Sequence, residues 1–304
     1  MHIVLVYHER LPVDRYGGTP RVVVWLARGL VELGHQVSLI GPPGSRLPEA
    51  RLIPVDSKAI GKRGFDVRPH LPKGAEILHA HIPFEPTDLP SLWTMHGNPT
   101  GGTYPANMVC LSADHARRLR SRTFVHNGLD QREYRFSAVK QPFDLFLGRL
   151  SSAKGWQWAV EGARRSGQSL IVAGGWRPSL RPGLKFVGEI GGDRKHDLLA
   201  DAACLWMPAQ WEEPFGLTLI EALASGTPVL GTRRGSLPEI ITPEVGALGN
   251  TLDDLVAARP ALVGIDPEAC RARVQRHFSH LAMAEAYLAV YRHLLDTGTL
   301  PAHL

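Results

Sequence analysis

Short apolar runs alternate with segments of helical periodicity along the whole chain of 304 residues. This alternation is typical of parallel sheets whose strands are connected by helices. The runs that we expect to form strands fall into two series. The first comprises His2–Tyr7, Val37–Ile40, Ile77–His79, Leu92–Met95 and Val109–Leu111, and the second comprises Phe143–Gly148, Leu170–Ala173, Lys185–Val187, Cys204–Met207 and Val229–Gly231. The pattern therefore predicts an α/β protein with two Rossmann-like units.

Helix and linker signals divide the chain further. Thr19-Pro20 is a predicted N-cap and first helical residue, and Gly34 is expected to end that helix. Leu281–Leu295 repeats apolar residues at helical spacing. The stretch Ser137–Pro142 interrupts the periodicity with polar residues and a proline, so we place the domain seam there. The expected parts are an N-terminal domain over residues 1–137, a C-terminal domain over 138–280 and a final helix over 281–304.

Length and composition agree with this division. A chain of 304 residues exceeds the size at which a single core stops growing. The first residues, Met1–Tyr7, lack the basic and cleavable parts of a signal peptide, and no apolar run approaches a membrane span. The three cysteines are widely spaced, which favours buried thiols in a reducing compartment over a disulfide framework; they are Cys110, Cys204 and Cys270. We therefore expect a cytoplasmic protein.

The excess positive charge lies in the N-terminal half. Residues 1–137 contain 17 Lys+Arg against 12 Asp+Glu, whereas residues 138–304 contain 17 of each. The densest basic stretch is Arg117–Arg122. A solvated helix face explains this charge, and the alternative is attraction to an anionic acceptor or to the inner face of a membrane. Nucleic acid is not an expected partner, because no basic motif with interspersed aromatic residues accompanies the charge.

The most informative motif is Glu213-Pro-Phe-Gly-Leu-Thr-Leu-Ile-Glu221. It places one carboxylate just before a predicted helix and a second about two turns inside it. A carboxylate accepts hydrogen bonds from two adjacent hydroxyls, as a ribose or hexose ring presents them. Pro214 and Gly216 let the first amides of the helix face a sugar or phosphate. The motif therefore predicts a sugar-nucleotide site.

A second motif supplies positive charge. The diphosphate of a sugar nucleotide is negatively charged, so its site needs a metal ion or fixed cations. The sequence contains no Asp-x-Asp metal motif, but it places Arg149 and Lys154 at the end of a predicted strand. An Arg side chain can bond two phosphate oxygens at once, and a Lys side chain acts as a mobile point charge.

These motifs stand among others in a recognisable order: Asn127-Gly-Leu-Asp130, Gly148–Gly155, Ala222–Leu230 and Gly235–Ile241, preceded by Tyr16-Gly17-Gly18, His79-Ala-His81 and Met95-His96-Gly97. Together they resemble the retaining GT-B glycosyltransferases of family 4. The resemblance is dense from Asn127 to Ile241 and thinner before it. It implies the GT-B fold, in which two Rossmann-like domains face each other across a cleft and the last helix crosses back to the N-terminal domain.

The resemblance also assigns roles. Arg149 and Lys154 would hold the pyrophosphate, Glu221 the ribose hydroxyls and Glu213 the transferred sugar. The other donor-binding positions that it implies are Gly17, Gly18, Val187, Gly188, Phe215, Gly216 and Leu217. The expected catalytic residues are His96, Arg149, Lys154 and Glu213, with His96 near the reacting face of the donor.

Two local features qualify the resemblance. Ser236 stands where the family usually has a second glycine, and we expect Ser236 and Glu239 to form a capping box. His79 and His81 share one strand face, but no third ligand lies near them in the sequence, so no metal site is predicted.

The implied activity is retaining, metal-independent transfer of a glycosyl group from a nucleotide diphosphate sugar, with a UDP-sugar favoured. The acceptor would be a small molecule, a glycan or a lipid-linked intermediate, and no cofactor is expected. Two alternatives stay open: a GT-B epimerase or phosphorylase, and a noncatalytic sugar-nucleotide binding protein. A nicotinamide oxidoreductase is not favoured, because the first strand leads into His8–Pro12 and not into Gly-x-Gly-x-x-Gly.

Overall fold

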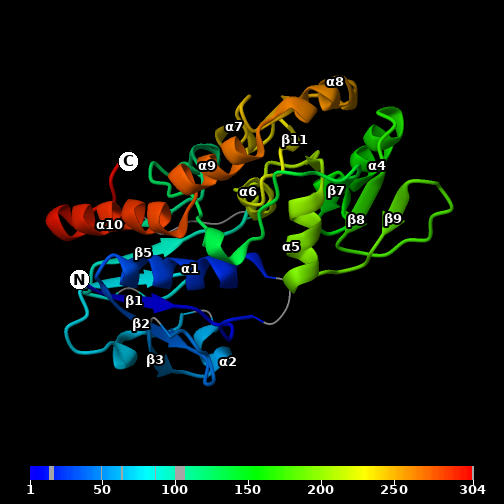
Figure 1. Ribbon diagram of the computed structural model, residues 1–304. Helices are drawn as coiled ribbons and strands as arrows, with labels where there is room; N and C mark the ends of the chain where they lie inside the picture. The colour runs from blue at the N-terminus through cyan, green and yellow to red at the C-terminus, as the bar shows by residue number, and fades with distance from the viewer. Residues whose placement is uncertain (14–16, 49, 63, 86, 100–106, 303–304) are drawn as a thin grey trace. The chain divides into compact units, whose positions relative to one another are not determined.

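The computed structural model describes residues 1–13, 17–48, 50–62, 64–85, 87–99 and 107–302. The chain folds into two compact units, of which unit 1 comprises Met1–Leu129 and Ser279–Leu304 and unit 2 comprises Asp130–Phe278. Each unit contains one six-stranded sheet, and every strand pair is parallel (Figure 1). The predicted α/β class with two Rossmann-like units is confirmed.

The sheet of unit 1 has the strand order β3-β2-β1-β4-β5-β6. The strands are β1 (His2–Val6), β2 (Gln36–Gly41), β3 (Arg51–Pro54), β4 (Ile77–Ala80), β5 (Ser91–Thr94) and β6 (Met108–Val109). The helices are α1 (Gly18–Glu32), α2 (Ser57–Ile60), α3 (Ala113–Arg118), α10 (His280–Thr297) and the short 3-10 turn η1 (Arg68–His70). Every residue of β1 is buried, as expected for a central parallel strand covered on both faces.

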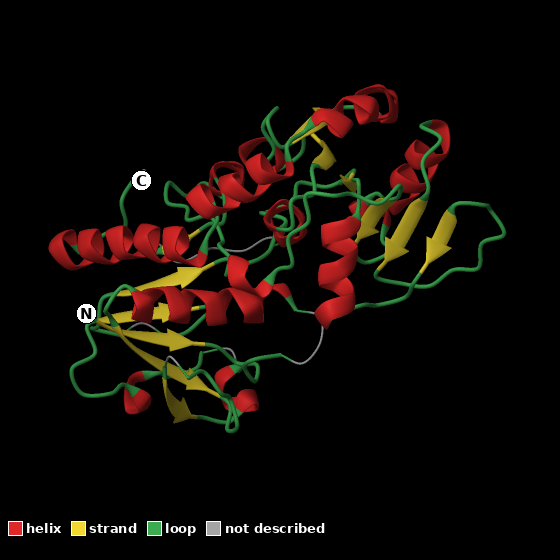
Figure 2. Cartoon of the chain, viewed as in Figure 1, coloured by secondary structure: helices red, strands yellow, loops and turns green. Residues whose placement is uncertain are grey.

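The sheet of unit 2 has the order β12-β11-β10-β7-β8-β9. Its strands are β7 (Asp144–Leu147), β8 (Leu170–Ala173), β9 (Leu184–Phe186), β10 (Cys204–Met207), β11 (Val229–Thr232) and β12 (Gly246–Gly249). Its helices are α4 (Trp156–Arg165), α5 (Gly192–Asp201), α6 (Leu217–Ala224), α7 (Leu237–Ile240), α8 (Leu252–Ala258) and α9 (Pro267–His277), with 3-10 turns η2 (Gln131–Glu133), η3 (Ser152–Lys154) and η4 (Arg259–Gly264). Figure 2 shows this alternation of strands and helices.

The boundary between the units lies at Leu129 and Asp130, and not at the predicted Ser137. The predicted seam belongs to unit 2 because the backbone N–H of Ser137 donates to the carbonyl of Ser225 at 3.3 Å. The Lys140 ammonium also donates to the carbonyl of Ala200 at 2.7 Å. The chain returns to unit 1 at Ser279, where α10 begins, and α10 packs along α1.

The start of α1 differs from the prediction. Gly17 is the N-cap and no side chain caps the helix, so Thr19 lies inside the first turn. Thr19-Pro20 therefore marks the correct region, but the cap lies two residues earlier. The predicted end is confirmed, since α1 ends at Glu32 and Gly34 follows with a φ of 82°.

A buried ion pair joins the amino end of the unit 2 sheet to η4. Asp144, the first residue of β7, accepts from Arg259 through Nη2 at 2.6 Å and Nε at 2.8 Å, and from Trp206 Nε1 at 2.8 Å. Both charged side chains are almost completely buried. Removing one partner of such a pair would leave an uncompensated buried charge. The three cysteines are free and buried, as predicted.

One glycine allows two loops of unit 2 to meet. Gly155 has φ of 73°, and a Cβ at this position would overlap the carbonyl oxygen of Pro208. Gly167 has a similar φ of 67°, but a Cβ there would have no atom within 4 Å. The two positions therefore share the backbone requirement and differ in the space available.

We predict that Gly155→Ala destabilises the protein much more than Gly167→Ala. The control should lose about 1 kcal/mol for the positive φ, and Gly155→Ala should lose about 2 kcal/mol or more beyond that, since the loop must move. Urea unfolding of both variants measures the difference. Equal losses would show that the contact with Pro208 does not constrain the fold.

Candidate functional site in unit 2

The strand order places a switch point in the middle of the unit 2 sheet. β7 lies between β10 and β8, so the connections that leave β7 and β10 diverge at the carboxyl edge. Open parallel sheets bind ligands at this edge, where the loops separate. Lys154 follows β7, Glu213 follows β10 and Gly235 follows the neighbouring β11. Three adjacent strands thus deliver the predicted motifs to one edge.

Lys154 and Glu213 form an ion pair at this edge. Lys154 Nζ donates to Glu213 Oε2 at 2.5 Å, and the two side chains are 19% and 8% exposed. Trp211 Nε1 donates to the same oxygen at 2.9 Å. The Lys154 ammonium also lies 4.8 Å from the centre of the Trp211 ring, within the range of a cation–π contact. Two donors on one oxygen fix the orientation of the Glu213 carboxylate.

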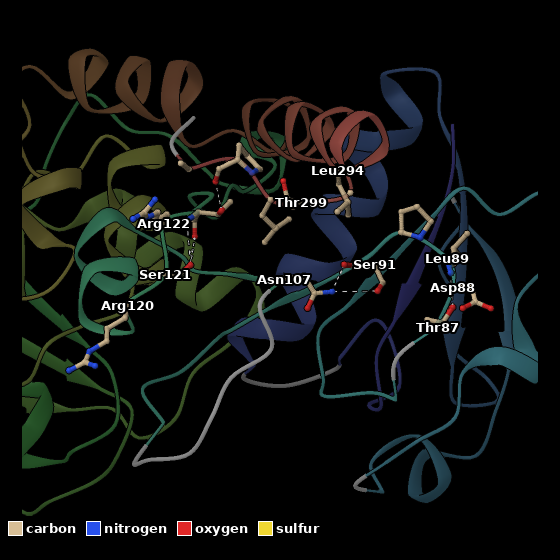
Figure 3. A pocket seen from close by; sticks show the side chains of 16 residues that line it. Thr87, Asp88, Leu89, Ser91, Asn107, Arg120, Ser121, Arg122, Leu294 and Thr299 are labelled. Atoms are coloured by element: carbon tan, nitrogen blue, oxygen red, sulfur yellow. Dashed lines mark hydrogen bonds between the residues drawn. The ribbon is translucent and has the colours of Figure 1, made fainter.

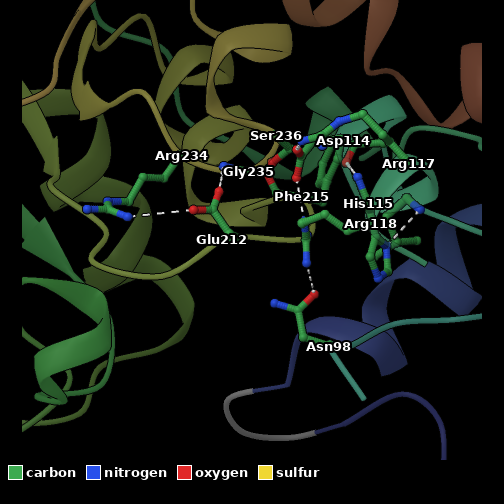
Figure 4. Close-up of polar contacts among 12 residues, drawn as sticks. Asn98, Asp114, His115, Arg117, Arg118, Glu212, Phe215, Arg234, Gly235 and Ser236 are labelled. Atoms are coloured by element: carbon green, nitrogen blue, oxygen red, sulfur yellow. Dashed lines mark hydrogen bonds and ion pairs between the residues drawn. The ribbon is translucent and has the colours of Figure 1, made fainter. Parts of the chain in front are cut away.

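Backbone contacts hold the loop that carries Glu213. The N–H of Ser236 donates to the Glu213 carbonyl at 2.9 Å. Gly235 has φ of 56°, and a Cβ there would overlap the backbone of Glu213. Figure 4 shows the side chain of Glu212 directed toward Gly235 and Arg234; its Oε2 accepts from the Gly235 N–H at 2.6 Å. Glu212 therefore serves the loop, and Glu213 faces Lys154.

The predicted capping box at Ser236 is wrong. Ser236 makes no side-chain cap bond to α7. Its hydroxyl donates instead to the carbonyl of Phe215 at 2.7 Å (Figure 4), and the residue is completely buried. A buried hydroxyl takes the nearest open acceptor, which here belongs to the loop before α6. Ser236 thus ties the Gly235 turn to the motif that contains Glu213.

Glu221 lies inside α6 and is only 1% exposed. Its Oε1 accepts from Lys195 Nζ of α5 at 3.0 Å and from the Tyr134 hydroxyl at 2.8 Å. The Lys195 ammonium lies 5.5 Å from the centre of the Tyr134 ring. Neither partner was predicted. Lys195 stands among polar helical residues without a motif, and Tyr134 is distant in sequence, so only the fold reveals them.

The other predicted donor-binding residues of unit 2 are placed as follows. Arg149 is exposed just beyond the end of β7. Val187 and Gly188 follow β9, where the N–H of Gly174 donates to the Gly188 carbonyl at 2.7 Å. Gly216 is the N-cap of α6 with φ of 85°, and Leu217 is the first residue of that helix.

Phe215 has a structural role that the motif did not indicate. Its side chain is 2% exposed, and its ring packs edge-to-face against Phe278 at 6.0 Å. This residue can offer a ligand only its backbone. Trp211 is the residue that sequence reasoning missed at this edge, although its position two residues before Glu213 was a usable signal.

Predicted residues of unit 1 gather at the carboxyl ends of β4 and β5. His81 Nδ1 and His96 Nε2 are 2.8 Å apart. Burial lowers the pKa of His96 to about 3 and holds the pKa of His81 well below its usual value. His79 is bonded by Tyr291 and Thr94 at 2.6 and 2.7 Å, so it is a structural residue. The His81–His96 pair is neutral at physiological pH.

Gly17 is the N-cap and Gly18 the first residue of α1, and their phosphate contact stays a prediction. Tyr16 of the same motif is outside the described residues. Within the described ranges, no group of three or more His, Cys, Asp or Glu side chains is arranged to hold a metal ion. A search of the same residues finds no helix that could span a membrane.

The basic stretch of unit 1 is partly neutralised. Asp114 pairs with Arg117 and with Arg118, whose Nε lies 2.6 Å from Asp114 Oδ2. Arg118 also donates to Asn98 at 2.9 Å (Figure 4). Arg120 and Arg122 line a cavity of about 780 Å³ at the amino end of β5 (Figure 3). None of the predicted site residues lines this cavity, which lies at the opposite edge of the sheet from His96.

The sequence and the fold are both similar to those of known glycosyltransferases. Residues 142–263 match the family described as Glycosyl transferases group 1. AviGT4, a glycosyltransferase involved in avilamycin A biosynthesis, superposes with a TM-score of 0.80 at 28% identity, over 99% of both chains. The fold is therefore that of GT-B glycosyltransferases.

The relatives found by sequence similarity include glycosyltransferases. An uncharacterized glycosyltransferase of Methanocaldococcus jannaschii is 31% identical over 119 residues, which are 34% of this chain and 30% of the relative. A phosphatidyl-myo-inositol mannosyltransferase of Propionibacterium freudenreichii is 23% identical over 300 residues, 78% of this chain and 79% of that protein. Residues 142–263 thus match the group 1 glycosyl transferase family, and the whole chain is similar in fold to GT-B glycosyltransferases. The match to the archaeal relative covers less than a third of that protein.

We predict that unit 1 loses stability as the pH falls from about 6.5 toward 4. Burial lowers the pKa of His115 to about 4 and that of His96 to about 3, whereas an unfolded histidine titrates near pH ~6.5. The unfolded chain therefore binds more protons in this window, and the stability present above it is lost on acidification.

For His115 the structure shows which hydrogen bond protonation would break. Its Nδ1 accepts from the Leu111 N–H at 3.2 Å and its Nε2 donates to the Gly97 carbonyl at 3.0 Å, so protonation breaks the first bond. Urea midpoints between pH 7.5 and 4.5 should fall less steeply in His115→Gln than in the wild type. An identical slope would exclude His115 as a contributor.

Proposed function

We propose that this protein transfers a glycosyl group from a nucleotide diphosphate sugar to an acceptor, with retention of anomeric configuration and without a divalent metal. The observation that carries the proposal is the Lys154–Glu213 ion pair at the switch point of unit 2. Lys154 would be the cation for a departing diphosphate, and Glu213 the carboxylate for sugar hydroxyls. Lys154 Nζ and Glu213 Oε2 lie 2.5 Å apart. The similarity to group 1 glycosyltransferases supports the same conclusion.

The chemistry assigned to these residues follows from charge. When the bond between the anomeric carbon and the diphosphate oxygen breaks, negative charge grows on the diphosphate. Lys154 is positioned to stabilise that charge, and exposed Arg149 is the second candidate cation. The acceptor hydroxyl would attack from the face that the diphosphate leaves, and the diphosphate oxygen would take its proton. Such a front-face path requires no covalent nucleophile from the protein.

Donor binding would exchange partners within the ion pair. In the structure the Lys154 charge is compensated by Glu213. A bound diphosphate offers Lys154 a stronger acceptor, and hexose hydroxyls offer Glu213 new donors. Trp211 Nε1 donates to Glu213 at 2.9 Å and would hold the carboxylate through this exchange. The carboxylate is therefore oriented before the donor arrives, which reduces the cost of binding.

The three acceptor classes expected from the sequence, a small molecule, a glycan and a lipid-linked intermediate, remain part of the proposal. AviGT4 is involved in avilamycin A biosynthesis, and the relative from Propionibacterium freudenreichii is a phosphatidyl-myo-inositol mannosyltransferase. The partly neutralised basic stretch of unit 1 is the proposed contact for an anionic acceptor or membrane. UDP-sugars are the first donors to test. An epimerase or phosphorylase would act without an acceptor or with inorganic phosphate, and a binding protein would not turn over the donor.

We predict that turnover of the donor persists in EDTA and falls about 10²-fold or more in Lys154→Ala. The reason is that Lys154, and not a metal, supplies the charge for the leaving group. Release of nucleoside diphosphate measures both. Complete loss in EDTA that magnesium or manganese restores would contradict metal independence, and a normal rate in folded Lys154→Ala would remove Lys154 from the site.

We predict that Glu213→Ala and Glu221→Ala affect ligand binding differently. Glu221→Ala should weaken binding of both nucleoside diphosphate and donor, by roughly 1.5–3 kcal/mol for a charged hydrogen bond. Glu213→Ala should spare the nucleoside diphosphate and reduce donor binding or turnover, because the sugar exists only in the donor. Calorimetry with UDP and a UDP-sugar separates the two. Equal loss of UDP affinity in both variants would refute this division of roles.

A further inference from the structure

Glu221 is held by a buried cation on a neighbouring helix. Lys195 and Glu221 are 7% and 1% exposed, and the ammonium nitrogen and carboxylate oxygen are 3.0 Å apart. The Tyr134 hydroxyl donates to the same carboxylate oxygen at 2.8 Å. Taking two charges out of water is costly, and apolar residues of the same volume often serve stability as well or better. The pair therefore calls for an explanation beyond packing.

The position of the pair gives that explanation. Lys195 lies in the first turn of α5, directly after the loop that leaves β9. Glu221 lies in α6, whose first residue follows the Glu213 loop. In a parallel sheet flanked by helices, the helix N-termini lie at the carboxyl edge, where ligands bind. The buried ion pair thus joins α5 to α6 on the ligand side of unit 2.

A second lysine, the half-buried Lys140, joins the same two helices at their other ends. Lys140 Nζ donates to the carbonyls of Ala200, near the end of α5, and Ser225, the C-cap of α6, at 2.7 and 3.2 Å. A third bond at 2.9 Å reaches the Thr227 hydroxyl. None of these acceptors is a carboxylate. Lys140 therefore fastens α5 to α6 through neutral acceptors, and it is the structural counterpart of Lys195.

We propose that Lys195 is a positioning residue for nucleotide recognition. Its ammonium, with the Tyr134 hydroxyl, fixes the Glu221 carboxylate in the orientation in which it takes hydrogen bonds from the ribose hydroxyls. The pair thereby sets a preference for ribonucleotides over 2′-deoxyribonucleotides. This inference rests on the proposed function, since it takes the ligand of unit 2 to be a nucleoside diphosphate.

The test compares nucleotides that differ in one hydroxyl. Calorimetry would measure binding of UDP, GDP and ADP, and of their 2′-deoxy forms, to the full chain. The proteins are the wild type, Lys195→Met, Lys195→Arg, Tyr134→Phe and the control Lys140→Met. A hydrogen bond to a charged group gives about a tenfold to hundredfold preference, so the wild type should bind the ribose form that much more tightly.

The variants should separate positioning from packing. Lys195→Met should bring the ribose-to-deoxyribose affinity ratio close to one, and Lys195→Arg should restore most of it. Tyr134→Phe should reduce the ratio in part. Lys140→Met should keep the wild-type ratio even if it unfolds at lower urea concentration. A general loosening of α5 against α6 would lower the ratio in both lysine variants.

Each other outcome overturns the inference in a recognisable way. A wild-type ratio in Lys195→Met shows that Lys195 does not position Glu221, while turnover of the donor leaves the proposed function standing. If Lys195→Met does not fold, an unchanged ratio in Tyr134→Phe leads to the same conclusion. A wild type that binds UDP without a ribose preference also overturns the inference. A wild type that binds none of the nucleotides defeats the proposed function, and the inference with it.

Discussion

The close approach of three loops at the carboxyl edge of unit 2 is the constraint on which the candidate site depends. Gly155 lies against the Pro208 carbonyl and Gly235 lies against the Glu213 backbone, both so closely that a Cβ would overlap. These contacts hold the loops after β7, β10 and β11 against one another. Lys154 and Glu213 meet at 2.5 Å because their backbones are held in this way. The ion pair is therefore a consequence of backbone packing, and the charges then orient each other.

Three ion pairs with buried carboxylates lie at the two edges of the unit 2 sheet. Asp144 and Arg259 pair at the amino edge, where β7 begins and no ligand is expected. The pairs Lys154–Glu213 and Lys195–Glu221 lie at the carboxyl edge. A parallel sheet has unlike edges, since every strand starts at one and ends at the other. The same kind of interaction therefore stabilises the fold at one edge and lies at the proposed ligand-binding edge on the other side.

Unit 1 presents a different kind of polar chemistry. Its corresponding strand ends carry the neutral pair of His81 and His96, whose pKa values burial keeps below the physiological range. Neutral imidazoles donate and accept hydrogen bonds without attracting a counter-ion. Such a surface suits uncharged hydroxyls better than phosphates. Two of the basic side chains of this unit, Arg120 and Arg122, lie at the opposite sheet edge.

The sequence alone determined the two series of strands and the motif residues at the strand ends, because apolar runs and a fixed order of glycine, proline and charged residues are local signals. The order of the strands within each sheet came from the structure. The sequence did not indicate β3 and β12, the outermost strands on one side of each sheet. The first is half-exposed and the second reads Gly-Ala-Leu-Gly, so neither carries the apolar run of a buried strand. The tertiary structure alone decided which partners the motif residues have: Ser236 bonds Phe215 and not its own helix, and Lys195 and Tyr134 hold Glu221. A side chain buried between distant segments takes whichever donor or acceptor the packing brings near, and no local pattern records that choice.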